Sequence, residues 1–254
     1  MGETDQLAQL IVQSRKVVVF TGAGISTESG IPDFRSPGGI WSRYDPDDFT
    51  IQKFLSGPAA RKTIWKMSME GGLLTEAKPN LAHCAIAELY QSGKLDCVIT
   101  QNIDNLHQKA GVPGDRVFEL HGNMEWVVCL SCHRRFPMPE VLRKIKEGVE
   151  VPDCPECQGV LKPDAVFFGE ALPQETLQEA IRRAQDCDLF IVIGSTLVIY
   201  PAAYIPTYAT EAGVKLAIVN LTPTPFDHCA EVIIRGKAGE IMSKVMEKIR
   251  LHYR

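Results

Sequence analysis

The stretch "VVVFTGAGISTESGIPDFR", Val17 to Arg35, decides the fold class. It opens with an apolar run of the kind that forms a strand buried on both faces, and Gly22 and Gly24 then provide a turn. Nucleotide sites in parallel sheets often begin in this way. The dehydrogenase pattern G-x-G-x-x-G is not met, because the third glycine, Gly30, comes late. The stretch therefore predicts a nucleotide-binding domain without the fingerprint of hydride transfer.

Apolar runs alternate with helical patterns along the rest of the chain. The runs 97–100, 189–193 and 216–219 are as continuously apolar as the first, which is typical of parallel strands buried on both faces. Other apolar residues recur at helical spacing, in three groups: Leu177, Ala180, Ile181 and Ala184; Ile241, Val245 and Ile249; Leu81, Ala85 and Leu89. We therefore predict an α/β fold, a doubly wound parallel sheet with helices on both faces.

Two stretches interrupt this alternation. Residues 40–78 hold a helical pattern behind a loop rich in Pro, Gly and Asp, and residues 126–162 hold paired cysteines. We predict that both are insertions that form a smaller domain from a helical module and a cysteine-containing module. Residues 1–39, 79–125 and 163–254 then make up the nucleotide-binding domain.

The paired cysteines have the spacing of a metal site. Two C-x-x-C pairs are separated by 21 residues: Cys129, Cys132, Cys154 and Cys157. This spacing is close to that of structural zinc sites, and four thiolates leave no open position for a reacting water. Redox pairs and ordinary buried thiols are the alternatives, and His133 is a possible replacement for one thiolate. The remaining cysteines lie in apolar patterns, which predicts small core residues: Cys84, Cys97, Cys187 and Cys229.

Polar residues follow several of the predicted strands, where doubly wound folds bind ligands. Gln101, Asn102 and Asp104 follow the run 97–100, where they can grip a ribose or a carboxamide; capping of a helix by Asp104 or Asn105 is the equal alternative. From the sequence alone, a ligand site and a helix cap are equally compatible with these residues.

His121 lies after a strand-like run and before a glycine. A histidine there can act as a base near neutral pH, or it can simply bond to the backbone. Ser195 and Thr196 follow the run 189–193, and Asn220 ends the next one. Such hydroxyls and backbone N–H groups suit phosphate or ribose oxygens.

Composition excludes several classes of partner. The chain has 254 residues, 45% of them hydrophobic, and a formal net charge of −4, which gives no general attraction to nucleic acid. Its first residues lack the pattern of a signal peptide, and no apolar run approaches the roughly 20 residues of a membrane span. We expect a cytoplasmic monomer with no direct nucleic-acid or membrane partner.

Together these motifs resemble the sirtuin family of NAD-dependent protein lysine deacylases, in a compact core form without long terminal extensions. The resemblance covers almost the whole chain in the family's order: "GAGIS", "GIPDFR", "TQNID", "HGN", the two C-x-x-C pairs, "VFFGE", "YPAA" and "VNL". It implies a Rossmann-type domain and a smaller domain made of a zinc ribbon and a helical module. NAD and acyl-lysine would meet between the two domains. The late glycine would belong to a loop that folds over the cofactor.

The resemblance also implies the site residues. The cofactor loop and the nicotinamide end would be formed by Gly22, Ala23, Gly24, Ser26, Thr27, Asp33, Phe34, Arg35, Gln101, Asn102, Ile103 and Asp104. The adenosine half would be held by Gly194, Ser195, Thr196, Asn220, Leu221 and Ala238. His121, also in contact with the cofactor, and Asn102 would be catalytic. The substrate backbone would add a strand to Val166, Phe167, Phe168, Gly169 and Glu170.

In the implied reaction, the acyl oxygen attacks the anomeric carbon as nicotinamide leaves, and His121 then activates a ribose hydroxyl. The products are free lysine and an acyl ester of ADP-ribose. The rival functions are ADP-ribosyl transfer to protein and a non-catalytic NAD-sensing module, and a base at His121 argues against the second. A dehydrogenase is the weakest option.

The helical module carries an expectation about the acyl group. Family members that prefer malonyl or succinyl lysine resemble one another in a Tyr and, three residues later, an Arg that hold the distal carboxylate. Our best register places Met67 and Glu70 there, which predicts a preference for acetyl or longer neutral acyl groups. A rotated helix would instead present Arg61, Lys62 or Lys66.

Overall fold

The computed structural model describes residues 2–70 and 76–252, and it confirms the α/β class. Six parallel strands form the main sheet in the order β3-β2-β1-β7-β8-β9. Their bounds are Val17–Thr21 (β1), Leu95–Thr100 (β2), Val117–Glu119 (β3), Leu189–Ile193 (β7), Lys215–Asn220 (β8) and Val232–Arg235 (β9). The order reverses between β1 and β7, so the carboxyl ends of these two strands flank the switch point at which such sheets bind ligands.

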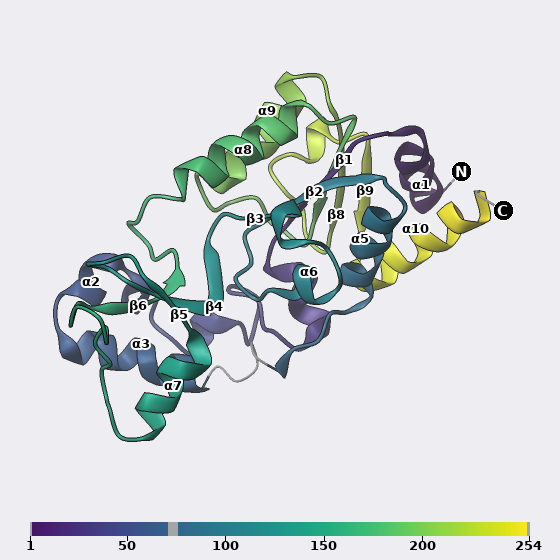
Figure 1. Cartoon of the computed structure of the whole chain (residues 1–254). Helices are drawn as coiled ribbons and strands as arrows, with labels where there is room; N and C mark the ends of the chain where they lie inside the picture. The colour runs from purple at the N-terminus through teal and green to yellow at the C-terminus, as the bar shows by residue number, and fades with distance from the viewer. Residues whose placement is uncertain (1, 71–75, 253–254) are drawn as a thin grey trace.

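Helices cover both faces of this sheet, as Figure 1 shows. One face packs against α1 (Glu3–Gln13), α5 (Leu81–Gln91) and α10 (Ala238–His252), and the other packs against α8 (Gln174–Gln185) and α9 (Ile205–Glu211). The central strands β1 and β7 are buried along their whole length. The continuous apolar runs of the sequence therefore mark strands that are covered twice.

Three residues of the predicted core are in fact exposed. Leu81 begins α5 but is 60% exposed, and Cys84, three residues later on the same outer side of the helix, is exposed too. The inner side of α5 is formed by Ala82, Ala85, Ile86 and Leu89. Cys97 and Cys187 are buried as expected, whereas Cys229 is exposed in a short turn after β8.

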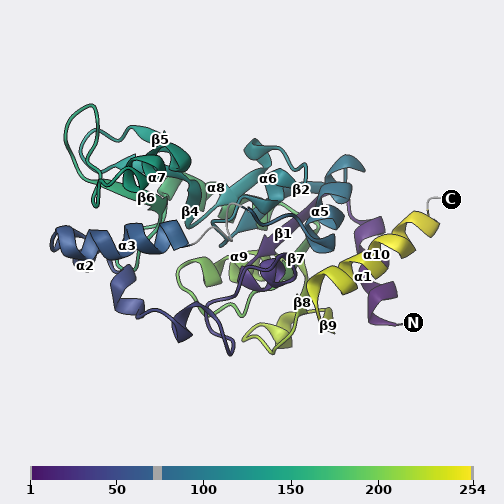
Figure 2. The same ribbon diagram turned by 90° about the horizontal axis from the view of Figure 1, so that it is seen from below.

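A second, three-stranded antiparallel sheet lies apart from the first, in the order β5-β4-β6. It consists of Gly122–Cys129 (β4), Arg135–Pro137 (β5) and Leu161–Ala165 (β6), with α7 (Met138–Lys146) beside it. The helices α2 (Ile51–Leu55) and α3 (Pro58–Glu70) lie next to this module in both views (Figures 1 and 2). Trp65 of α3 is fully buried among side chains of β4 and α7, so it joins the two insertions into one body.

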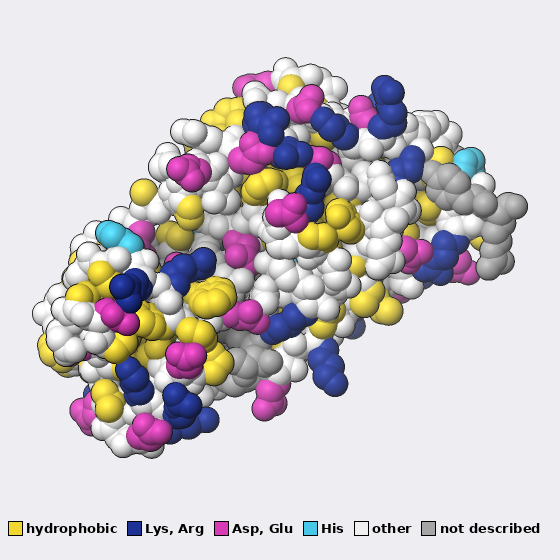
Figure 3. Space-filling view, viewed as in Figure 1, with side chains coloured by type: hydrophobic (Ala, Val, Ile, Leu, Met, Phe, Trp, Pro, Cys, Tyr) yellow, Lys and Arg dark blue, Asp and Glu magenta, His cyan; other side chains and the backbone are white. Residues whose placement is uncertain are grey.

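The face seen in Figure 3 has no large patch of purely positive or purely negative side chains, because Lys and Arg are interspersed with Asp and Glu. Within residues 2–70 and 76–252, no helix has the length and apolarity that a membrane crossing requires.

Candidate active site

A cavity of about 420 Å³ lies where the carboxyl ends of the central strands face the smaller module. Its wall is largely apolar, with a few polar groups at one end, as expected of a small-molecule site. It is lined by many of the residues singled out in the sequence: Ala23, Ser26, Phe34, Arg35, Gln101, Asn102, Ile103, Asp104, His121, Val166, Phe167, Phe168, Gly169 and Glu170. These residues are far apart in the chain, and the fold brings them together.

A buried hydrogen-bond network fixes the polar end of the cavity. The Ser26 hydroxyl donates to Asp104 Oδ2 at 2.6 Å, and Asn102 Nδ2 donates to Ser26 Oγ at 3.1 Å. Asp104 Oδ1 also accepts the backbone N–H of Leu106 at 3.0 Å. Asp104 therefore satisfies the first turn of α6 (Leu106–Lys109), as the capping interpretation expects, and it also holds the loop after β1 against the end of β2. Its role toward a ligand stays a prediction.

His121 is oriented for base chemistry. Its Nδ1 lies 2.9 Å from the backbone carbonyl of Gln101, and since a carbonyl only accepts, Nδ1 carries the proton. Nε2 is then the unprotonated nitrogen of a neutral ring that lines the cavity. Burial lowers the pKa of His121 below its ordinary value, and the bond to Gln101 opposes this in part. The ring is consequently neutral at physiological pH.

The segment from Val166 to Glu170 crosses the cavity mouth. The Val166 N–H donates to the His121 carbonyl, and the Phe168 N–H donates to the Phe49 carbonyl, both at 2.9 Å. Among the described residues, the carbonyl of Val166 and the N–H of Gly169 have no intramolecular partner. Unpaired backbone groups of this kind are what an added strand requires.

The sequence did not reveal an aromatic cluster on the same wall. The Trp41 ring lies 5.2 Å from Phe34, 5.1 Å from Phe49 and 6.0 Å from Phe168, measured between centroids. Trp41 and Phe49 come from the loop rich in Pro, Gly and Asp. Their aromatic side chains are the feature of the sequence from which the cluster could have been predicted. The cluster ties this loop to the segment after β6 and closes one side of the cavity.

The other residues assigned to the cofactor do not line the cavity: Gly22, Gly24, Thr27, Asp33, Gly194, Ser195, Thr196, Asn220, Leu221 and Ala238. A Cβ on Gly24 would lie 2.8 Å from the Gly194 carbonyl oxygen, so these glycines let two loops cross. Gly194 also has φ +65°, which favours glycine. Ser195 Oγ donates to Gln101 Oε1 at 2.8 Å, which links this end of β7 to the cavity.

Other members of this outer group have local structural roles. The Asp33 carboxylate accepts the N–H groups of Arg35 and Ser36, which shapes the loop. Thr27 is exposed and donates its hydroxyl to the Gly24 carbonyl. Among the residues that the structure describes, the backbone N–H groups of Ser195 and Thr196 have no partner, which leaves donors for an anionic or ribose group.

The four paired cysteines converge as predicted. Their Sγ atoms all lie within 4.8 Å of one another, with 3.8 Å between Cys132 and Cys154 and 3.5 Å between Cys129 and Cys157. Tetrahedral zinc with Zn–S bonds of about 2.3 Å places its sulfurs about 3.8 Å apart, so the residues fit a zinc ion. His133 is not part of the group.

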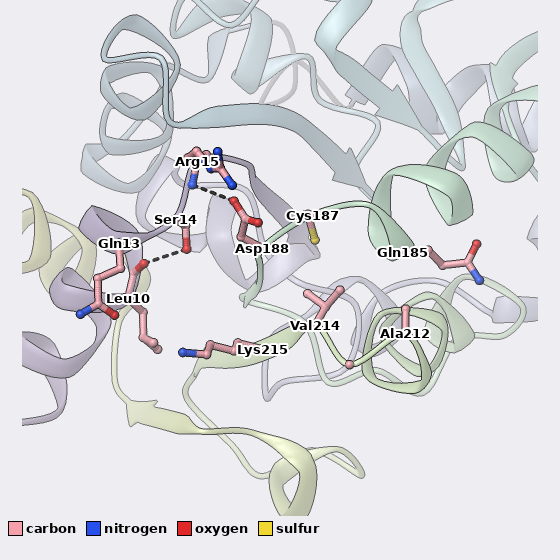
Figure 4. A pocket seen from close by; sticks show the side chains of 11 residues that line it. Leu10, Gln13, Ser14, Arg15, Gln185, Cys187, Asp188, Ala212, Val214 and Lys215 are labelled. Carbon is pink, nitrogen blue, oxygen red and sulfur yellow. Dashed lines mark hydrogen bonds between the residues drawn. The ribbon is translucent and has the colours of Figure 1, made fainter.

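A second groove, also of about 420 Å³, lies at the amino-terminal edge of the main sheet (Figure 4). Its one carboxylate, Asp188, already accepts the N–H groups of Arg15 and Lys16 at 2.7 and 2.8 Å. Burial raises the pKa of its thiol, Cys187, to about 12. The side chains of Gln185 and Lys215 point in different directions (Figure 4). This groove presents no convergent chemistry.

The fold and the site together define a Rossmann-type enzyme with a small thiolate-bearing module. The model of the Sir2 family matches residues 22–201, and the chain belongs to that family. An NAD-dependent protein deacetylase of Pyrobaculum aerophilum is 45% identical, over 98% of this chain and 95% of the relative. An NAD-dependent protein deacylase of Archaeoglobus fulgidus is 48% identical, over 98% and 96%.

Solved structures agree over almost the whole chain. A structure described as the basis for the mechanism and regulation of Sir2 enzymes has a TM-score of 0.88 and 47% identity, covering 99% of both chains. A complex of Sir2 with a p53 peptide and NAD⁺ has a TM-score of 0.89 and 42% identity, covering 99% of this chain and 100% of the other. A Sir2 variant with a deacetylated p53 peptide and 3′-O-acetyl-ADP-ribose has a TM-score of 0.89 and 43% identity, covering 96% and 98%.

Proposed function

We propose that this protein is an NAD-dependent protein lysine deacetylase or deacylase, which cleaves NAD to nicotinamide and transfers the acyl group to ADP-ribose. The observation that carries the proposal is the shared cavity. It brings the unprotonated Nε2 of His121, the polar network around Asp104 and an unpaired peptide-binding segment into one space. Relatives named for this activity, and similar structures bound to NAD or acetylated peptides, support it.

His121 has the role of general base toward a ribose hydroxyl, and Asn102 is the second catalytic residue. Ser26, Asn102 and Asp104 suit the nicotinamide end, because their hydroxyl, amide and carboxylate groups can pair with a carboxamide. Ser195 and Thr196 suit the far half of NAD through their free N–H groups. The roles of Gly22, Gly24, Thr27, Asp33, Asn220, Leu221 and Ala238 stay proposals of the same kind.

Zinc is structural in this proposal. Cys129, Cys132, Cys154 and Cys157 fill a tetrahedral shell, which leaves no position for water. The ion would fix the loops between β4, β5 and β6, and these strands carry the segment that receives the peptide. The module boundaries at residues 40–78 and 126–162 remain predictions.

The acyl group meets the wall formed by α3. Met67, Ile64 and Glu70 of this helix line the cavity, whereas Arg61, Lys62 and Lys66 do not. The register therefore agrees with the expected positions of Met67 and Glu70. The cations that line the cavity are Arg35 and Arg43 of the preceding loop. We propose a preference for neutral acyl groups, acetyl included.

A cytoplasmic location is part of the proposal. Its support is chemical: NAD is an intracellular cosubstrate, and four thiolates that bind zinc persist in a reducing compartment. The partner is an acyl-lysine protein or peptide, and a monomer is sufficient, since the described residues of one chain form the whole cavity.

The discriminating experiment is nicotinamide release from NAD with an acetylated peptide and with the same peptide unacetylated. Deacylation requires release only with the acetylated peptide. Release without acyl-lysine, accompanied by ADP-ribose bound to protein, would favour the ADP-ribosyltransferase instead.

A further inference from the structure

Lys162 is a buried lysine that the proposed reaction does not use. It lies in β6 and is 4% exposed. Its Nζ donates to the carbonyls of Pro163 at 3.2 Å and Ala165 at 2.6 Å, and to Glu170 Oε2 at 3.0 Å. These bonds use all three protons of the ammonium group, and the Phe167 ring lies 4.5 Å from Nζ. A buried charge with this many partners is held in one position.

Glu170, the partner of Lys162, closes a turn in the peptide-binding segment. The same Oε2 atom accepts the Phe167 N–H at 2.7 Å, and the Glu170 N–H donates to the Phe167 carbonyl at 3.0 Å. Gly169 within the turn has φ +87°, a conformation that glycine favours. The Glu170 carboxylate therefore stabilises the turn through its Oε2 atom.

The segment is held by two means that alternate along it. Backbone bonds hold Val166 to His121 and Phe168 to Phe49 and Ile51. The Glu170 carboxylate, which Lys162 neutralises, holds Phe167. The unpaired N–H of Gly169 lies between Phe168 and Glu170, within the turn that this carboxylate closes.

We propose that Lys162 is a positioning residue for the peptide substrate: its ammonium group, acting through Glu170, holds the turn that presents the Gly169 N–H to an added strand. The proposal rests on the proposed function, because it assumes that an acyl-peptide binds along this segment. Lys162 contacts neither His121 nor the network of Ser26, Asn102 and Asp104. Its loss should therefore weaken peptide binding and leave NAD binding and the chemical step in place.

The test compares Lys162→Met with the wild-type enzyme in steady-state deacetylation. We expect KM for the acetylated peptide to rise about tenfold, with KM for NAD and kcat within about twofold, because uniform binding of the peptide is lost. Lys162→Arg restores the cation and its donors, so KM for the peptide should return to within about threefold of wild type. The matched control is Lys62→Met. This substitution removes an exposed ion pair with Glu150 that lies outside the segment, so we expect no measurable change in KM or kcat.

An unchanged peptide KM in Lys162→Met would overturn the proposal, and so would equal losses for NAD and peptide or a loss in kcat alone. If Lys162→Met does not fold, Glu170→Gln takes its place. This substitution removes the negative charge opposite Lys162 and keeps the shape of the side chain, and we expect the peptide KM to rise about threefold. An unchanged peptide KM would contradict the proposal.

Amide hydrogen exchange of the wild-type protein gives a readout that does not depend on activity. The Phe167 amide should exchange more slowly than the Gly169 amide, and equal rates would contradict the role of Lys162. The exchange rates stay informative even if acyl-peptide triggers no release of nicotinamide by the wild type. That result would refute the proposed function, but it would leave the structure of the turn untouched.

Discussion

One pocket lies at the edge of the main sheet formed by the amino ends of its strands and another at the edge formed by their carboxyl ends, yet only the second is equipped for chemistry. At the carboxyl edge, His121 keeps an unprotonated nitrogen, and the segment from Val166 to Glu170, which we propose binds the peptide, keeps unpaired backbone groups. At the amino edge, the Asp188 carboxylate accepts the backbone N–H of Arg15 (Figure 4) and that of Lys16, and burial keeps the Cys187 thiol protonated.

The difference shows that a hollow alone does not make a site. Parallel strands direct their final residues, and the loops after them, toward one edge, so polar groups from several strands converge there. The amino edge receives the ends of helices and the entries to strands, whose polar groups satisfy one another. The predictions that follow test this contrast, beginning with the largest effect.

Replacing the base should have the greatest consequence. For His121→Ala we expect deacetylation kcat/KM to fall by about 10²–10⁴-fold, the range typical of a lost general base. NAD binding, measured by calorimetry, should change by less than about threefold, because the Ser26, Asn102 and Asp104 network is untouched. The matched change at the other edge, Lys215→Gln, should leave kcat/KM within about twofold. Near-normal turnover of His121→Ala would remove the base assignment.

Metal removal should act on the smaller module. For Cys154→Ser we expect loss of bound zinc and a decrease in Tm of more than about 10 °C, since the energy of metal binding contributes to folding. Activity should be lost as a consequence. The control is Cys229→Ser, an exposed cysteine outside the cluster, which should keep both metal and Tm. A folded, fully active and metal-free Cys154→Ser protein would contradict a structural role for zinc.

The acyl group should be discriminated more modestly. We expect kcat/KM for an acetylated peptide to exceed that for its succinylated counterpart by more than about tenfold, because an unpaired carboxylate is costly to bury beside Met67 and Glu70. A Met67→Ala variant should keep the order of preference, since it introduces no cation. Equal or better turnover of the succinylated peptide would show that Arg35 or Arg43 acts as a carboxylate clamp.

The pH dependence of kcat/KM on the acid side should show the smallest effect. Burial lowers the pKa of His121 below 6.5, so the neutral base remains the majority form at pH 6.5 and is lost only as the pH falls further. We therefore expect kcat/KM at pH 6.5 to exceed half its plateau value near pH 7.5. A midpoint above pH 7 in the free enzyme's profile would conflict with the buried environment of the ring.

Much of this site was readable from the sequence, for identifiable reasons. Continuous apolar runs marked the strands, and polar residues such as Asn102 and Asp104 marked their ends. Trp41 was missed because its loop has no periodicity and is shaped by rings from Phe49 and Phe168. Lys162 was missed because a lysine beside Pro163 and Asp164 in a short strand means little until the turn brings Glu170 to it.

The fate of the acetyl group tests the central claim most directly. A peptide with an isotopically labelled acetyl group is incubated with NAD and the enzyme, and the products are identified by mass spectrometry. We expect the label on ADP-ribose as an acyl ester, in a 1:1 ratio to nicotinamide and to free lysine, because in the proposed reaction the base, the cosubstrate and the peptide meet in the carboxyl-edge cavity. Free labelled acetate with intact NAD, or ADP-ribose attached to a peptide that keeps its acetyl group, would contradict the account.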